Sequence, residues 1–245
     1  MQNIHTEPLG NGIKVFVSDS YHFSTDTILL ADFSKPHGRK KCVDLGTGCG
    51  TIPLLWCRNN RSLEVFAVEI QSNACELAQK SVELNNLGNN IKILNYDLKD
   101  LKGKIPYGYF DLVSCNPPYK IGGGGIMNPD SARQVARHET ECTLDDICEC
   151  ASKLLQFGGR FCICQRPERL ADVMESMRKF SIEPKILRMV QQRTAKAPKL
   201  FLLEGRRGGS RGFLNVLPAL FIENENGEFS EEMIRIYGSY KEGRI

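Results

Sequence analysis

One short stretch of the sequence has residue types that can hold an amino group, Asn116-Pro117-Pro118-Tyr119. Two successive prolines fix φ and remove backbone donors, so that carbonyl oxygens are presented outward. The Asn116 side-chain oxygen and the Pro117 carbonyl would then be two acceptors directed at one point. Such a pair would hold an amide or exocyclic NH2 group and direct its nitrogen lone pair at an electrophile. Tyr119 offers a flat face on which a planar group can stack.

A second candidate site is the glycine-rich turn Asp44-Leu-Gly-Thr-Gly-Cys-Gly50. Gly46, Gly48 and Gly50 follow an apolar run and open a helix-like stretch, a context in which backbone can approach a nucleotide-like ligand. Their spacing is G-x-G-x-G, whereas dinucleotide enzymes use G-x-G-x-x-G and keep the helix N-terminus for a pyrophosphate. An acid at Asp44 would disfavour that anion and would suit a cationic amino-acid group. A dehydrogenase is therefore disfavoured.

Two further carboxylates follow predicted strands. Glu69 ends one apolar run and is placed like the carboxylate that holds a ribose diol in nucleotide-binding folds. Asp97 lies just past the next run, from which it could reach an adenine amino group. Asn116 directly follows a third run, and in an open α/β sheet this edge faces the ligand crevice.

The elements that must position these residues alternate along the chain. Short apolar runs predict parallel strands at Lys41–Leu45, Glu64–Glu69, Ile91–Asn95, Phe110–Cys115 and 160–164. Helices are predicted at 51–59, 72–85, 144–155 (ended by Gly158 and Gly159) and 167–180 (begun by a proline). Final strands at 185–190, 200–204 and 214–221 suggest an antiparallel hairpin at one edge. This alternation indicates βαβ units, and we expect one α/β domain with a doubly wound, mostly parallel sheet.

The composition is that of an ordinary globular chain. Its 245 residues are 41% hydrophobic and 25% charged, which excludes a disordered, collagen-like or disulfide-stapled protein. The longest apolar stretch, 213–222, contains Asn215 and Pro218 and falls short of the ~20 residues of a membrane span. The N-terminus lacks the basic and apolar regions of a secretory signal. We therefore expect a cytoplasmic protein without a membrane partner.

The ten cysteines are expected to be packing residues in a reducing compartment. Cys42, Cys115, Cys162 and Cys164 lie within apolar runs, where a free cysteine behaves as a small hydrophobe. No C-x2-C pair exists to begin a zinc site, so we expect no metal.

Charge is spread unevenly along the chain. The formal net charge is +3, yet residues 160–211 hold 13 Lys and Arg against 5 Asp and Glu, a local charge of +8. This asymmetry points to a polyanion bound by the C-terminal half, and a solvated surface is the alternative interpretation.

These motifs give the chain a family resemblance. It resembles class I S-adenosylmethionine-dependent methyltransferases, in particular those that methylate amino nitrogens through an Asn-Pro-Pro-Tyr motif, over about residues 23–221. Within that class it is similar to small bacterial enzymes that methylate N6 of adenine-37 in one valine transfer RNA. Three further stretches carry this narrower resemblance: Phe23-Ser-Thr-Asp-Thr-Ile-Leu-Leu-Ala31, Ala136-Arg-His-Glu139 after the glycines 122–125, and Leu203-Glu-Gly-Arg-Arg-Gly-Gly209.

The resemblance implies a Rossmann-like class I methyltransferase domain over residues 23–245, with a seven-stranded sheet and an N-terminal extension at 1–22. It also implies S-adenosyl-L-methionine as the cofactor. Phe23 and Thr25 would close over its methionine part, Glu69 would hold the ribose and Asp97 the adenine. The full set of implied cofactor residues is Phe23, Thr25, Asp44, Gly46, Gly48, Gly50, Glu69, Asp97 and Asn116.

The same resemblance assigns catalysis to the Asn-Pro-Pro-Tyr motif. Asn116 and the Pro117 carbonyl would accept the N6 hydrogens of a flipped adenine, and Pro118 and Tyr119 would contact that base. Methyl transfer would be direct and in line. The implied partner is a transfer RNA, with the anticodon arm of a valine transfer RNA as the expected substrate.

Basic residues of the C-terminal half are expected to contact RNA phosphates, with Arg206 and Arg207 as substrate-binding residues. An alternative is that these two arginines only brace the end of a strand. The expected phosphate contacts are Arg193, Lys196, Lys199, Arg206, Arg207 and Arg211.

Other functions stay open at this point. A glutamine side-chain amide in a translation factor presents the same donors as adenine N6, although enzymes with that substrate usually carry an extra N-terminal helical domain. Another base amino group, in ribosomal RNA for example, or guanine N2 or cytosine N4, would also fit. A catalytically silent RNA-binding module is the non-enzymatic alternative, which cofactor binding would test.

Overall fold

The computed structural model describes residues 3–117 and 142–238. Of the residues singled out above, Pro118, Tyr119, the glycines 122–125 and the stretch 136–139 lie outside the described residues.

The described chain is built on one large, mostly parallel sheet. Its parallel strands are β3 (Lys41–Leu45), β4 (Glu64–Glu69), β5 (Ile91–Asn95), β6 (Phe110–Cys115) and β7 (Leu155–Gln165). The order in space is β5-β4-β3-β6-β7, so the sheet grows in one direction from β3 to β5 and in the other from β6 onward. The strand order therefore reverses between β3 and β6, where open α/β sheets bind ligands.

The predicted hairpin completes the sheet beside β7. Strand β9 (Pro198–Arg207) pairs antiparallel with both β7 and β8 (Ile182–Gln191). Two short strands, β10 (Asn215–Val216) and β11 (Leu220–Phe221), add to the outer edge of β8. They replace the single strand expected over 214–221, because Pro218 between them has no N–H for a ladder. The sheet therefore has nine strands in the described part of the chain, and its seven longer strands are those that the sequence predicts.

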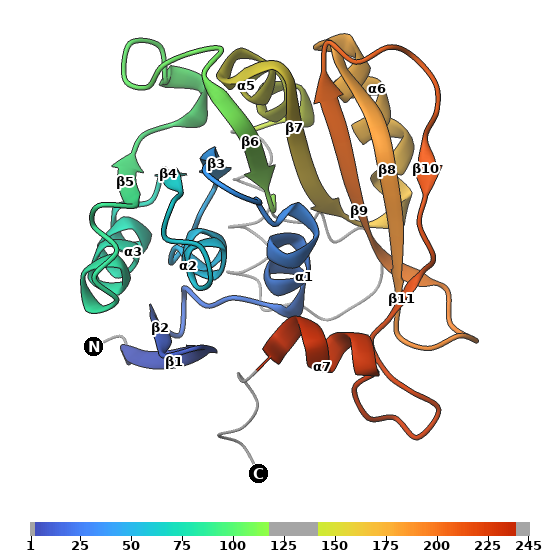
Figure 1. Cartoon of the computed structure of the whole chain (residues 1–245), viewed down its shortest axis with the longest axis horizontal. Coiled ribbons are helices and arrows are strands. Elements are labelled where there is room, and N and C mark those ends of the chain that lie inside the picture. The colour runs from blue at the N-terminus through green and yellow to red at the C-terminus, as the bar shows by residue number, and fades with distance from the viewer. Residues whose placement is uncertain (1–2, 118–141, 239–245) are drawn as a thin grey trace.

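Helices cover both faces of the sheet (Figure 1). One face packs against α1 (Thr25–Ser34), α2 (Thr51–Cys57), α3 (Ser72–Leu84) and α7 (Glu231–Tyr237). The other face packs against α5 (Leu144–Leu154) and α6 (Leu170–Lys179), with the single-turn helices η1 (Leu98–Asp100) and η2 (Pro167–Arg169) at strand ends. Cys42 and Val43, neighbours in β3, enter opposite cores, as the alternation of a strand buried on both sides requires.

The N-terminal extension forms a hairpin of β1 (His5–Gly10) and β2 (Ile13–Val17). No strand was expected over these residues. Ser81 Oγ accepts from the Phe16 backbone N–H at 2.9 Å, and Asn85 Oδ1 accepts from that of Lys14 at 2.9 Å, so the hairpin is fixed to α3. Its buried side chains share the core of α1 and α2.

Two boundaries differ from the prediction around residue 155. Helix α5 ends at Leu154, and β7 already begins at Leu155, so Gly158 and Gly159 lie inside a strand rather than at a helix end. A Cβ on Gly159 would lie 2.9 Å from Leu155 Cδ2 and 3.0 Å from the Phe110 carbonyl oxygen. The glycine therefore permits close approach of two chains. The predicted helix at 167–180 begins as η2 and continues as α6.

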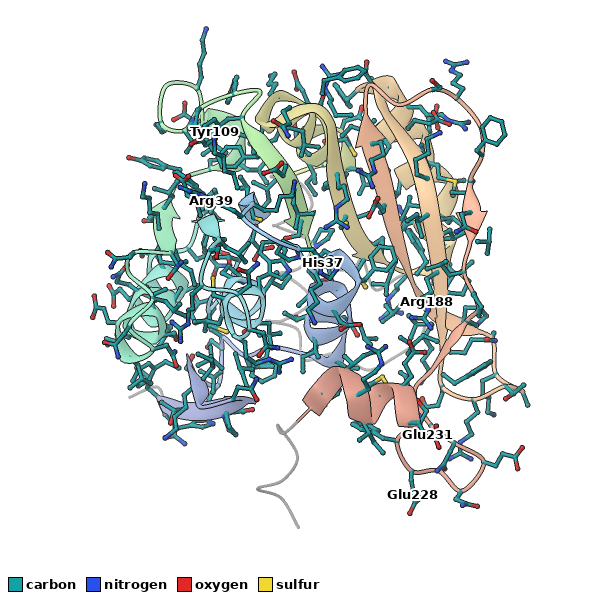
Figure 2. All side chains as sticks on the ribbon, viewed as in Figure 1. His37, Arg39, Tyr109, Arg188, Glu228 and Glu231 are labelled. Atoms are coloured by element: carbon teal, nitrogen blue, oxygen red, sulfur yellow. The ribbon has the colours of Figure 1, made fainter. Side chains whose placement is uncertain are left out.

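The cysteines and one ion pair contribute to the packing of the domain. Nine of the ten cysteine thiols are buried, and Cys142 is half-buried. Arg188, labelled on β8 in Figure 2, makes a bidentate pair with Glu232 of α7 at 2.9 and 2.6 Å, which ties that helix to the sheet edge. Among the described residues, no helix is long and apolar enough to cross a membrane.

Candidate functional site

The main pocket opens at the carboxyl ends of the central strands, at the reversal point of the sheet. Its volume is about 450 Å³, within the range of small-molecule sites. It joins the glycine turn after β3, Glu69 at the end of β4 and Asn116-Pro117 after β6. Its walls are formed by Leu45, Gly46, Glu69, Ile70, Gln71, Leu98, Cys115, Asn116, Pro117, Cys142, Thr143, Leu144, Ile147, Gln165 and Arg169.

The glycine turn has a backbone conformation that explains its composition. Gly46, Gly48 and Gly50 have φ of 70°, 56° and 84°, in the left-handed region that other residues rarely adopt. A Cβ on Gly50 would also lie 3.2 Å from Ala78 Cβ, so α2 and α3 approach closely here. The turn thus presents bare backbone to the pocket at the start of α2. Of the three glycines, Gly46 lines the pocket.

Glu69 is fixed by the backbone on both sides. Its Oε2 accepts from the Gly48 N–H at 2.9 Å and its Oε1 from the Gln71 N–H at 3.0 Å, while the side chain is nearly buried. A carboxylate can accept about four hydrogen bonds, so the same oxygens can take two further donors from a ligand. Its expected role as a ribose acceptor stays a prediction.

Asp97 borders a smaller, adjoining pocket of about 220 Å³. Its Oδ1 accepts from the Lys99 N–H at 2.9 Å and caps η1, and its Oδ2 lies 3.6 Å from Lys99 Nζ. The two pockets share Gly46, Glu69, Ile70, Leu98 and Cys142 and form one depression.

Apolar side chains that were not predicted as site residues form much of this depression. Ile70 directly follows β4, Leu98 follows Asp97, and Ile147 comes from the second turn of α5. A flat aromatic group between such side chains would lose its contact with water. Ile70 and Leu98 each directly follow a carboxylate that was predicted to bind the cofactor. This position in the sequence could have identified them as site residues.

Asp44 lies beneath the turn and does not border the pocket. It is 1% exposed, and Ser114 Oγ of the neighbouring strand β6 donates to its Oδ1 at 2.5 Å. Burial, and to a smaller extent the nearby carboxylate of Glu69, raises the pKa of Asp44 to about 7 although the Ser114 hydrogen bond lowers it. Its expected role in cofactor binding stays a prediction.

The raised pKa predicts a pH-dependent stability. A carboxyl that binds its proton more tightly in the folded state stabilises the fold at low pH, and this contribution is lost as the pH rises to the folded pKa near 7. Asp44→Asn keeps an acceptor for Ser114 and removes the buried charge. Its free energy of unfolding relative to wild type should rise by up to roughly 3 kcal/mol between pH 5 and pH 8. Urea unfolding at both pH values measures this, and a pH-independent difference would contradict it.

Asn116 is oriented by α1. Its Nδ2 donates to Thr27 Oγ1 at 3.2 Å, so the amide oxygen points away from Thr27. Both Asn116 and Pro117 border the main pocket, where an acceptor pair was expected. Thr27 was part of a stretch quoted for the resemblance, but nothing in the sequence indicated that it would contact a residue 89 positions away.

Removing the Thr27 acceptor should impair the orientation of Asn116. Thr27→Val preserves shape and removes the hydroxyl, and a hydrogen bond of this kind contributes about 0.5–1.5 kcal/mol. We expect kcat of a transfer reaction to fall about 3- to 10-fold with unchanged cofactor affinity, and Thr27→Ser to retain wild-type kcat. Steady-state kinetics of the two variants measure this. Equal losses in Val and Ser variants would indicate a packing role instead.

Phe23 and Thr25 are not among the residues that border the main pocket. Thr25 Oγ1 lies 3.2 Å from Tyr237 Oη, in a hydrogen bond that joins α1 to α7. Phe23 packs partly buried against the core of α1 and α2. Their expected contact with the methionine part of a cofactor stays a prediction.

Arg206 and Arg207 lie at the opposite edge of the sheet from the pocket. Arg206 is in register with Arg160, and Arg160 with Leu112 near the start of β6, whereas the pocket residue Gln165 ends β7. Arg206 Nε lies 3.0 Å from Glu204 Oε1, and Arg207 Nε donates to the Ser152 carbonyl at 3.0 Å. These contacts brace the strand end, so any RNA contact of the pair would involve a surface separate from the pocket.

No cluster of metal-ligating residues is present within 3–117 and 142–238.

The sequence of this chain is similar to those of known proteins. A protein of Tolumonas auensis named tRNA1(Val) (adenine(37)-N6)-methyltransferase is 29% identical over 140 residues, which is 57% of this chain and 56% of that protein. The chain thus matches little more than half the length of this relative. A protein of Parabacteroides distasonis with the same name is 27% identical over 219 residues, which is 86% of this chain and 87% of that protein.

Solved structures show the same fold. A predicted O-methyltransferase of Agrobacterium tumefaciens superposes with a TM-score of 0.69 at 20% identity, over 87% of this chain and 95% of that one. A geranyl diphosphate methyltransferase solved in complex with SAM gives a TM-score of 0.56 at 12% identity, over 74% of this chain and 84% of that one. The family model described as methyltransferase small domain matches residues 10–180. The chain belongs to the methyltransferase small domain family.

Proposed function

We propose that this protein methylates the exocyclic N6 amino group of an adenine in transfer RNA with S-adenosylmethionine as the donor, and that the adenine is position 37 of a valine transfer RNA. The observation that carries the proposal is the single pocket that joins Glu69 and the glycine turn to Asn116 and Pro117. Two relatives named for this reaction support the choice of substrate. We expect the reaction to take place in the cytoplasm.

The residues of the pocket fit S-adenosylmethionine. The backbone-held carboxylate of Glu69 can accept from two vicinal hydroxyls, and Asp97 can accept from an adenine amino group. Ile70, Leu98 and Ile147 supply apolar walls for the adenine. The cofactor would bring an electrophilic methyl group, carried on a sulfonium. Asp44, charged above pH 7, would favour this cation through space.

Asn116 and Pro117 would act on the target amino group. Their two oxygens would accept the hydrogens of the NH2 group, hold its nitrogen lone pair toward the methyl group and favour the more tetrahedral nitrogen of the transition state. Positioning and local electrostatics, rather than a strong base, would then provide the rate acceleration. A target base must leave its stack at a cost of a few kcal/mol, which is smaller in a loop. We propose that Pro118 and Tyr119 contact that base, with about 1–3 kcal/mol from stacking on the tyrosine.

The proposal is tested with an unmodified transcript of a valine transfer RNA and labelled S-adenosylmethionine. We expect one methyl group per transcript, and a transcript with guanine in place of adenine-37 should accept none. Equal labelling of both transcripts would leave the reaction type in place and would disprove the nucleotide. Labelling of a translation factor in preference to RNA would favour the glutamine alternative.

A further inference from the structure

The loop between β9 and β10, Gly208–Leu214, has a composition and a geometry that the pocket does not account for. It arches over the end of the sheet at the top right of Figure 1, beyond the last residue of β9. The pocket lies at the other end of the strands, since it borders Gln165 at the end of β7. The pocket residue Gln165 is in register with Phe201, and about 20 Å of β9 separates Phe201 from the end of the strand at Arg207.

Phe213 is the most unusual residue of this loop. Its side chain is 94% exposed, and its φ is 56°, a conformation that is strained for a bulky residue. An aromatic ring in water and a left-handed backbone are both unfavourable, and no packing within the described fold compensates for either. Residues held in this way cluster at binding sites.

The loop is held in a defined shape by its neighbours. Lys185 Nζ donates to the carbonyl oxygens of Ser210 at 2.6 Å and of Gly212 at 2.7 Å. The Gly212 N–H donates to Glu183 Oε1 at 3.1 Å, and Glu183 in turn pairs with Arg178 at 2.9 Å. These contacts use backbone atoms of the loop, so the side chains of Arg211 and Phe213 are left on the outside.

A second exposed aromatic ring lies at the same edge. Phe157 is 84% exposed, and its ring lies so close to Gly208 that a Cβ there would be 2.3 Å from it. Phe157 also borders a pocket of about 370 Å³, whose cationic side chains are Lys40, Arg160 and Arg206. Asp111 and the buried Glu204 pair with cations of this group. Arg211 pairs with no carboxylate in the part of the chain that the structure describes.

We propose that the loop Gly208–Leu214 together with Phe157, here called the basic aromatic edge, is a second contact surface for the RNA substrate. Cations that accompany exposed aromatic rings are the combination that binds unpaired nucleotides, with phosphates on the cations and bases stacked on the rings. Arg211 and Phe213 would carry this contact. The inference rests on the proposed function for the identity of the RNA.

The separation of the two sites makes the proposal specific. An RNA that occupies both sites must extend from the pocket to the far edge of the sheet, and we expect the part of a transfer RNA beyond its anticodon stem-loop to make the second contact. The basic aromatic edge would then select a whole transfer RNA, whereas the pocket selects the reacting base.

The test compares binding of an unmodified full-length valine transfer RNA transcript and of its anticodon stem-loop to the full chain. The double variant Arg211→Ala/Phe213→Gly removes the charge and the ring, and glycine at φ of 56° relieves strain, so the fold is preserved. We expect Kd for the transcript to rise about tenfold or more and Kd for the stem-loop to stay unchanged. The slope of log Kd against log salt concentration for the transcript should fall by the amount of about one phosphate contact. KM for the transcript should rise by the same factor at constant kcat and constant affinity for S-adenosylhomocysteine.

The matched control is Lys80→Ala/Leu84→Ala, which removes an exposed cation and an exposed apolar side chain from α3. It should bind both RNAs as wild type does. Unchanged transcript affinity in the Arg211/Phe213 variant, or an equal loss for transcript and stem-loop, would overturn the second surface. If the wild-type protein methylated no transfer RNA, the proposed function would fail as well. If wild type methylates transfer RNA and both double variants keep full activity, the second surface is disproved and the proposed function is not.

Discussion

Replacing Asn116 with alanine is expected to lower kcat by about 10²- to 10³-fold, the range found when one preorganised polar group is removed from a reacting centre. Asn116 holds one of the two acceptors placed at the end of β6, and Thr27 fixes its orientation. Cofactor affinity should stay within about threefold of wild type, because Glu69 and the glycine turn are unchanged.

Single-turnover methylation of a transfer RNA transcript gives the rate of the chemical step, and calorimetry with S-adenosylhomocysteine gives the affinity. Asn226→Ala, in the exposed loop before α7, is the matched control and should behave as wild type. A parallel loss of rate and of cofactor affinity in Asn116→Ala would argue against its role at the amino group.

Replacing Glu69 with alanine is expected to weaken cofactor binding about 100-fold. The change removes an acceptor for two ribose hydroxyls, and hydrogen bonds to a charged group contribute about 1.5–3 kcal/mol each. It also leaves the N–H groups of Gly48 and Gln71 without the carboxylate that now accepts from them, which loosens the turn.

The same strand supplies the control for this variant. Glu64 begins β4 at the far end from the pocket and forms a surface pair with Lys92 at 3.8 Å, so Glu64→Ala should retain wild-type cofactor affinity. Calorimetry with S-adenosylhomocysteine compares the two variants. An affinity of Glu69→Ala within threefold of wild type would show that the carboxylate does not hold the ribose.

The central strands could be predicted from the sequence to the residue. The predicted bounds of β3, β4, β5 and β6 agree with the structure, because a strand buried on both faces is a short apolar run that turn residues interrupt on either side. The antiparallel hairpin of β8 and β9 was also predicted, although both strands are longer than expected.

Elements at the periphery were missed because tertiary contacts, rather than local pattern, form them. The β1–β2 hairpin depends on the side chains of Ser81 in α3 and of Asn85 directly after it, and α7 depends on the Arg188 pair and on the core beneath it. Gly158 and Gly159 resemble a helix stop, yet the contact of Gly159 with the Phe110 carbonyl places them inside β7. No local rule distinguishes the two cases.

The candidate site was predicted where it depends on strand ends. Glu69, Asn116 and Pro117 come together with Gly46 because the carboxyl ends of parallel strands meet at one edge. Thr27 and Ser114 were missed, since their contacts join segments 70 to 89 residues apart. Arg206 and Arg207 lie at the end of the sheet opposite to the pocket, because β9 runs antiparallel to β7 and its last residues point away from the pocket.

The measurement that tests the central claim most directly is methylation of unmodified bulk transfer RNA with labelled S-adenosylmethionine, followed by digestion to nucleosides and mass spectrometry. The account predicts that all of the label appears in N6-methyladenosine, and that Asn116→Ala removes it. Label in another nucleoside, or no labelled nucleoside from a protein that still binds S-adenosylmethionine, would contradict adenine-N6 methylation of transfer RNA.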